Sequence, residues 1–118
     1  PNKDKFDIKT RALMPLIDGA RLFSLSHNLR GINNTYLRFK QLAITDPRNS
    51  EIYLNCSKAF LTLSKFRTME GLKNDNSGQF INLQELSKAD KEVLKNAFEP
   101  MEELEDLIKN KFQLTQFS

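Results

Sequence analysis

The side chains of this sequence that could do chemistry are mainly arginines. Four of them lie at or beside the apolar stripes of three separate helical segments: Arg11, Arg21, Arg38 and Arg67. A guanidinium group presents a planar fork of N–H donors that suits carboxylates and phosphates. Convergence of the four would therefore create a site for an anion. The alternative is pairing on a helix surface, as between Asp18 and Arg21, which contributes only about 0.2–0.5 kcal/mol to helix stability.

Motifs typical of catalysis are missing from the sequence. No Gly-rich phosphate-binding loop precedes a helix, and no Ser, His and acid form a recognisable catalytic motif. The one histidine, His27, is interpreted as a residue at a helix end or on the surface. The one cysteine, Cys56, falls on an apolar stripe and is interpreted as unreactive core. A structural zinc site would need more His or Cys ligands than these two.

The polar loop of residues 73–84 has the length of an EF-hand loop but not its ligands. Asp75 and Gly78 occupy plausible positions in it, yet Lys73 stands first and Gln84 twelfth. A calcium loop needs an acidic residue at the first position and usually a bidentate Glu at the last. The acidic run of residues 102–106 is interpreted as a hydrated helix face. We therefore expect no metal site.

Composition favours one helical domain spanning residues 1–118. This length suits a single core, and only 4 Gly and 4 Pro argue against disorder and against a turn-rich all-β fold. No apolar run approaches the roughly 18 residues of a membrane span, so no membrane partner is expected. The single cysteine fits a reducing compartment, which predicts a cytoplasmic protein. The first residue is not Met, and we expect a C-terminal fragment of a longer protein.

Charge is distributed unevenly along the chain. The net charge of +3 is too small to indicate binding to nucleic acid. Residues 1–48 hold nine Lys or Arg against four Asp or Glu, a balance of +5, whereas residues 49–118 have a balance of −2. This asymmetry fits either complementary helix surfaces within the bundle or an anion-facing patch on the N-terminal part.

Apolar periodicity predicts an all-α fold, an antiparallel bundle of four main helices. The expected helices cover about residues 7–30, 34–46, 49–72 and 87–112, with Asn34 or Thr35 and Ser87 as N-terminal caps. The only strand-like piece is FINL at residues 80–83. The first helix should be broken or kinked near Pro15, after a short turn at residues 8–13, because proline is tolerated in a first turn. A kink is also expected at Pro100.

Four stretches together carry a resemblance to a known family. They are DIKTRALMPLIDGARLF at residues 7–23, NTYLRF at 34–39, AFLTLSKFR at 59–67 and INLQELSKADKEVLKNAF at 81–98. In this order and spacing the chain resembles, over nearly its whole length, the nucleotidyltransferase substrate-binding domain. That module forms the C-terminus of bacterial signalling proteins. It follows a cyclic-nucleotide-binding-like domain, a pair of CBS domains and a nucleotidyltransferase domain related to PII-protein uridylyltransferase.

The resemblance implies a helical bundle docked beside a catalytic domain of the same parent chain. That domain would carry a Gly-Ser segment and metal-binding aspartates, and it would use Mg and NTP. Neither feature occurs in this sequence, so the chain alone should be no enzyme and should need no cofactor. The resemblance also implies that residues 7–11 lie nearest the nucleotide cleft. Its motifs contain the expected substrate-binding residues: Asp7, Lys9, Arg11, Arg21, Thr35, Arg38 and Arg67.

Two functional hypotheses follow from these observations. In the first, the chain is a non-catalytic module that recognises a substrate or partner, and its arginines with Lys9 neutralise phosphate or an acidic protein or small-molecule acceptor. In the second, it is a purely structural helical bundle that docks or forms a homodimer through an exposed apolar patch, without a polar groove. Whether the arginines share one groove distinguishes the two hypotheses.

Overall fold

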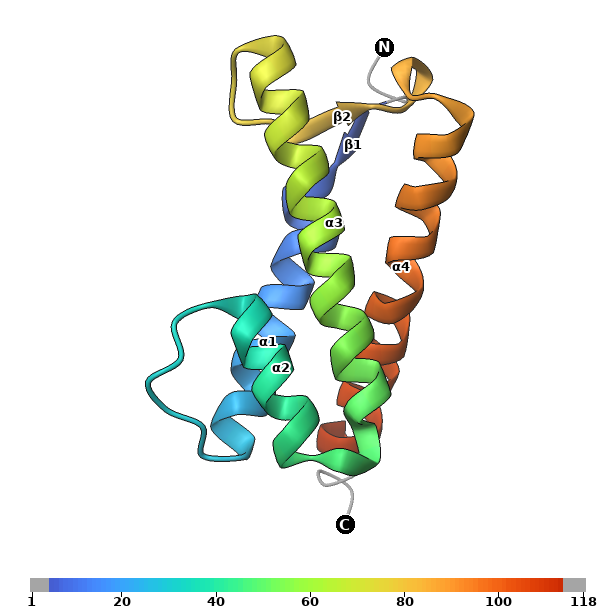
Figure 1. Cartoon of the computed structure of the whole chain (residues 1–118). Helices are drawn as coiled ribbons and strands as arrows, with labels where there is room; N and C mark the ends of the chain where they lie inside the picture. Colours follow the sequence, from blue (N-terminus) through green and yellow to red (C-terminus); the bar gives the residue numbers. More distant parts are fainter. Residues whose placement is uncertain (1–4, 114–118) are drawn as a thin grey trace.

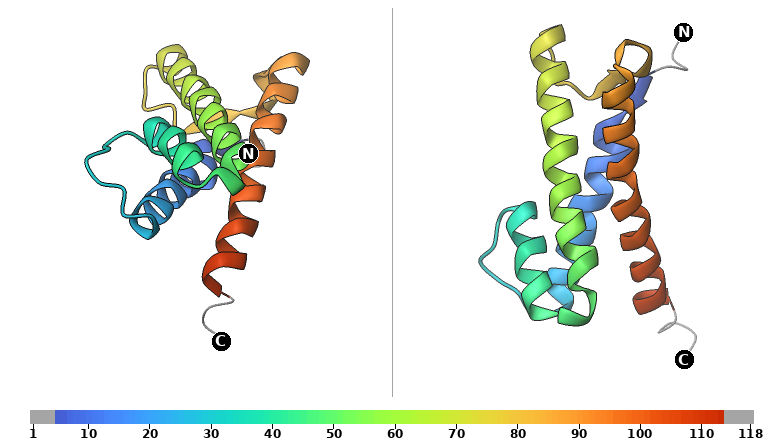
Figure 2. Two further views of the ribbon diagram at one scale, coloured as in Figure 1. Left: turned by 60° about the horizontal axis from the view of Figure 1, so that its bottom comes forward. Right: turned by 45° about the vertical axis from the view of Figure 1, so that its right-hand side comes forward.

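Four α-helices form most of the computed structural model, which describes residues 5–113 (Figure 1). They are α1 (Met14–Ser26), α2 (Thr35–Thr45), α3 (Ser50–Asn74) and α4 (Lys88–Ile108). The longest, α3, runs antiparallel to α2 and α4, while α1 and α2 point the same way and are joined by residues 27–34 (Figure 2). The predicted all-α bundle of four main helices is confirmed. Within the described residues, no helix has both the length and the apolar character needed to cross a bilayer.

A small two-stranded sheet closes one end of the bundle (Figure 1). Strand β1 (Lys5–Asp7) pairs antiparallel with β2 (Phe80–Asn82), and Phe6 lies opposite Ile81. The sequence predicted only the second strand. The first was missed because three residues are too few to show alternation, and their partner lies far away in the chain.

The helical hydrogen bonding changes type next to Pro15, where the break was predicted, and α1 begins at Met14. Residues Lys9–Leu13 form a π-helical turn, in which the Met14 N–H bonds the Lys9 carbonyl. Pro15 then occupies the first turn of α1, where a missing N–H does least harm. The backbone stays helical through Leu13 and Met14, so the two segments remain joined.

The end of α1 differs from the prediction. Asn28 takes a left-handed conformation with a φ of 57°. The Leu29 N–H donates to the Ser24 carbonyl at 2.8 Å, and the Asn28 N–H donates to the Leu25 carbonyl at 3.2 Å. This is a Schellman motif, in which Asn takes the place more often held by Gly. The end predicted at Arg30 is therefore wrong, because Asn28 stops the helix earlier.

The remaining helix ends follow local rules. Asn34 accepts a hydrogen bond from the Leu37 N–H and Ser87 accepts one from the Asp90 N–H, both at 3.0 Å, which confirms both predicted caps. Pro100 lies inside α4 without ending it.

Helices pack closely around an apolar core. Its largest fully buried side chains come from every main helix and include Phe23, Phe39, Tyr53 and Leu104. Gly19 permits the contact between α1 and α4, because a Cβ at that position would lie 2.6 Å from Leu104 Cδ2.

A polar cluster ties the ends of α1, α2 and α3 together at the pole opposite the sheet. The buried Tyr53 hydroxyl donates to Asp46 Oδ2 at 2.9 Å, Asn49 Nδ2 donates to the same oxygen at 2.9 Å, and His27 Nε2 lies 3.7 Å away. Burial alone would raise the pKa of Asp46, but the hydrogen bonds from Asn49 and Tyr53 outweigh it and hold that pKa below its ordinary value.

Replacing Asp46 with Ala should destabilise the fold by about 1–3 kcal/mol, because the buried Tyr53 hydroxyl loses its acceptor. Since folding lowers the pKa of Asp46, its contribution is present above the ordinary value of 3.8 and is lost as the pH falls through the lower folded value. Urea unfolding of both proteins between pH 7 and acid, at about one-unit steps, measures this difference. The exposed Asp18→Ala serves as the control and should change stability by less than about 0.5 kcal/mol. If the difference in unfolding free energy between the unchanged chain and Asp46→Ala stayed the same below the folded pKa of Asp46, this explanation would be contradicted.

Candidate functional site

A groove between the N-terminal turn and α3 brings two predicted site residues together. Its volume is about 340 Å³, and its lining combines two cations, two hydroxyls and an apolar surface: Lys9, Leu13, Met14, Ile17, Phe60, Ser64, Arg67 and Thr68. The cations come from opposite sides, Lys9 from the π-helical turn and Arg67 from α3. We call this the Lys9–Arg67 groove.

The turn that carries Lys9 is held by Asp7. The Asp7 carboxylate accepts a hydrogen bond from the Thr10 N–H at 3.0 Å, and Gln79 Nε2 bonds its two oxygens at 3.2 and 3.3 Å. The Thr10 bond is the main reason why the pKa of Asp7 lies below its usual value, and the charge of Lys9 lowers it further. Asp7 therefore positions the turn through bonds within the protein.

Arg67 is anchored by the loop that follows α3. Its Nε donates to the Ser77 carbonyl at 3.1 Å, and the side chain is partly buried. Next to Ser77, Gly78 has a φ of +71° and lies so close to α3 that a Cβ would clash with the Arg67 carbonyl oxygen and lie 2.8 Å from the Gly71 nitrogen. Only glycine permits this approach without strain. The loop thus fixes both the backbone and the side chain of Arg67.

Three consecutive loop residues connect the two sides of the groove. Ser77 binds Arg67, Gly78 packs on α3, and Gln79 binds Asp7 and also accepts from the Ile8 N–H at 3.0 Å. The position of Lys9 relative to Arg67 therefore depends on residues 77–79.

The electrostatics of the groove favour an anion. In the described part of the chain the ion pairs within 4.0 Å are His27–Asp46 and Lys73–Glu85, so neither Lys9 nor Arg67 has a described carboxylate within that distance. A charge-assisted hydrogen bond contributes about 1.5–3 kcal/mol. Across residues 5–113, no group of three or more His, Cys, Asp or Glu side chains could hold a metal ion.

The other predicted residues lie outside the lining of this groove. Arg21 is exposed on α1, one turn beyond Ile17 and on the same helix face. Thr35 is buried as the first residue of α2, and Arg38 is partly buried one turn later. Arg11 lies over the Phe6 ring, with its guanidinium carbon 5.3 Å from the ring centre.

Two polar residues of the groove were missed in the sequence. Ser64 and Thr68 belong to α3 and follow Phe60 at four-residue spacing, on the face that includes Arg67. The helical period places these positions together, so the signal was present. It was overlooked because hydroxyl residues are common on helix surfaces.

Comparison with known proteins gives one match. A family model described as "Putative nucleotidyltransferase substrate binding domain" matches residues 1–112 of the 118-residue chain. The matched range contains both sides of the Lys9–Arg67 groove and the loop between them. No curated protein and no solved structure matches the chain.

Replacing Gly78 with Ala should destabilise the fold by about 2–3 kcal/mol, through backbone strain and the clash with the Arg67 carbonyl. Gly31→Ala is the matched control, because Gly31 has a φ of +79° but nothing within 4 Å of its added Cβ. That variant should be less stable by only about 1 kcal/mol, the cost of the backbone strain alone. Urea unfolding of the two variants measures the difference. Equal losses would mean that packing of the loop on α3 does not matter.

Proposed function

Because the chain belongs to the family of nucleotidyltransferase substrate-binding domains, we propose that it is a non-catalytic recognition module of a signal-transduction nucleotidyltransferase. In this proposal a separate catalytic domain of the parent protein binds Mg and NTP and transfers a nucleoside monophosphate. The module docks beside that domain and contributes cationic groups to the shared cleft. The parent would be a bacterial cytoplasmic protein that also carries CBS and cyclic-nucleotide-binding domains.

The Lys9–Arg67 groove is the observation that carries this proposal. Arg67 keeps its terminal N–H groups for a ligand, because its bond to Ser77 uses Nε alone. Lys9 adds a second positive charge, and the hydroxyls of Ser64 and Thr68 add hydrogen bonds. A guanidinium, an ammonium and neutral hydrogen-bond donors are the kinds of group that bind phosphate in proteins. The groove thus suits a phosphate of the nucleotide or an acidic group of the acceptor.

Two potentially reactive side chains are buried, and this proposal assigns them no chemical role. Cys56 is fully buried, and burial is the main cause that raises the pKa of its thiol to about 12. Its thiol donates to the Pro100 carbonyl at 3.4 Å. Burial likewise raises the pKa of Tyr53 well above its usual value, and its hydroxyl is bound to Asp46. Neither group is a nucleophile at neutral pH.

The remaining predicted residues extend the proposed surface. Arg21 continues the α1 face that lines the groove, whereas Arg11 is exposed on the π-helical turn, where it lies over Phe6. Arg21 would contact a long or highly charged ligand such as a triphosphate, and Arg11 would contact only a partner as large as an acidic protein. Thr35 and Arg38 sit at the start of α2; because Thr35 is buried, we assign only Arg38 a secondary contact with the same partner.

Titration of the chain with ATP or UTP, followed by NMR, should shift the amide signals of residues around the Lys9–Arg67 groove. Arg67→Gln should weaken binding about tenfold, or about 1.4 kcal/mol, because the planar fork is lost. Arg67→Lys should bind with intermediate affinity, since it keeps the charge. Affinity should fall as salt is added.

Lys58→Gln provides the matched control, because Lys58 is an exposed cation on α3 that does not line this groove. It should bind the nucleotide like the unchanged chain. Inorganic phosphate as competitor separates recognition of phosphate from recognition of the base. Equal affinities for the Arg67→Gln and Lys58→Gln variants would disprove the assignment of the groove.

A further inference from the structure

A second and larger groove lies between α3 and α4. Its volume is about 660 Å³, and its apolar lining consists of Leu61, Phe66, Met69, Leu86 and Val93. Three of these side chains are unusually open to solvent: Leu61 is 50% exposed, Met69 62% and Val93 47%. Contiguous exposed apolar side chains framed by charges mark interaction sites. We call this the α3–α4 groove.

The two grooves lie on opposite sides of α3. Phe60, Ser64 and Arg67 line the Lys9–Arg67 groove, whereas the α3–α4 groove is lined by residues such as Leu61, Lys65 and Met69. At 100° per residue these two sets point in roughly opposite directions from the helix axis. A partner in the α3–α4 groove would therefore leave the anion site open.

The charges of the α3–α4 groove are sorted by wall. On α3, Lys65 and Lys73 alternate with apolar residues at four-residue spacing, so they form one row along the helix. The opposite wall carries Glu85, from the short 3₁₀ turn Leu83–Glu85, and Asp90 from the start of α4. The α3 wall also holds Glu70, but this side chain is buried and bound to Asn74, so the exposed charges of that wall are basic and those of the opposite wall are acidic.

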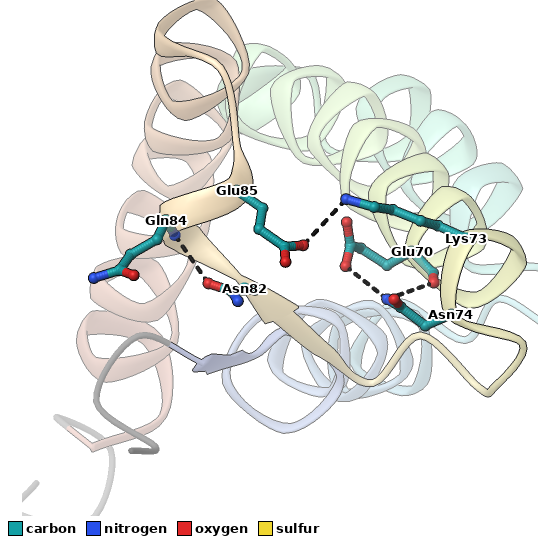
Figure 3. A network of polar contacts seen from close by, with 6 residues as sticks. All are labelled: Glu70, Lys73, Asn74, Asn82, Gln84 and Glu85. Atoms are coloured by element: carbon teal, nitrogen blue, oxygen red, sulfur yellow. Dashed lines mark hydrogen bonds and ion pairs between the residues drawn. The ribbon is translucent and has the colours of Figure 1, made fainter.

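One end of the groove is closed by an internal bridge. Lys73 Nζ bonds Glu85 Oε2 at 3.1 Å, and the buried Glu70 accepts from Asn74 Nδ2 at 3.2 Å (Figure 3). Further along, Lys65 and Asp90 form no ion pair with any described residue. These two charges and the apolar side chains around them remain available to a partner.

We propose that the α3–α4 groove binds a second copy of this chain. A two-fold axis parallel to the groove would place α3 of one copy opposite α4 of the other. The basic wall of each copy then meets the acidic wall of its partner, with Lys65 facing Asp90 twice. The apolar side chains between the walls would pack at the centre. Such an interface is isologous, because the same surface serves both copies.

Charge complementarity favours a second copy over an unrelated helix. A generic amphipathic helix would use the apolar floor alone, whereas a second copy also brings an Asp90 to each Lys65. The proposal is independent of the anion site, since it uses the other side of α3. It locates the homodimer that the sequence left open.

Analytical ultracentrifugation of the chain should show a dimer whose population rises with concentration. Met69→Glu should weaken association at least about tenfold, because charged groups are unfavourable at an interface centre. Lys65→Glu and Asp90→Lys should each weaken it similarly, since each brings like charges together twice. An equimolar mixture of the two charge variants should dimerise again, because opposite charges then face each other at both contacts.

Ile44→Glu is the control, because Ile44 is 73% exposed on α2 and does not line the α3–α4 groove. It should dimerise like the unchanged chain, and urea unfolding verifies that each variant is folded. The proposal is overturned if the unchanged chain stays monomeric up to about 1 mM, the range of very weak association. It is equally overturned if the mixture of Lys65→Glu and Asp90→Lys does not dimerise again. The same holds if Ile44→Glu weakens association as much as Met69→Glu.

Discussion

The contact of residues 77–79 with both the N-terminal turn and α3 is the constraint on which the rest of this structure depends. Ser77 fixes the Arg67 side chain, Gly78 packs against the α3 backbone, and Gln79 holds Asp7 and Ile8. Asp7 and Gln79 are 72 positions apart in the chain. These bonds therefore join the first and third segments of the bundle. Each is individually modest, about 0.5–1.5 kcal/mol, but together they set where Lys9 lies relative to Arg67.

The long helix α3 separates two chemically different surfaces. One side holds a small groove with cations and hydroxyls, and the other holds a larger apolar groove between charged walls. An amphipathic helix normally has one buried and one exposed face. Here α3 lies beside α2 and α4 (Figure 2), and different residues of α3 line the two grooves. With this arrangement, the proposed anion and the proposed second copy would bind without competing for the same surface.

Most of the fold could be predicted because it is encoded locally. The helical period identified all four helices, the caps at Asn34 and Ser87 depend on residues three positions away, and Pro15 breaks the hydrogen bonding within its own turn. The two failures have different causes. The end of α1 was misplaced because Asn28, a residue that less often adopts the left-handed conformation, ends it instead of Gly31. The strand β1 was missed because only its distant partner β2 makes it a strand.

For the site, the sequence by itself determined the family and the residue types: a chain with cationic motifs and no recognisable catalytic set. Only the tertiary structure decided that Arg67 shares its groove with Lys9, while Arg21 and Arg38 lie outside its lining. The reason is physical. Helical periodicity tells which residues share a face of one helix, but the meeting of two helices depends on contacts between distant segments, here those of residues 77–79.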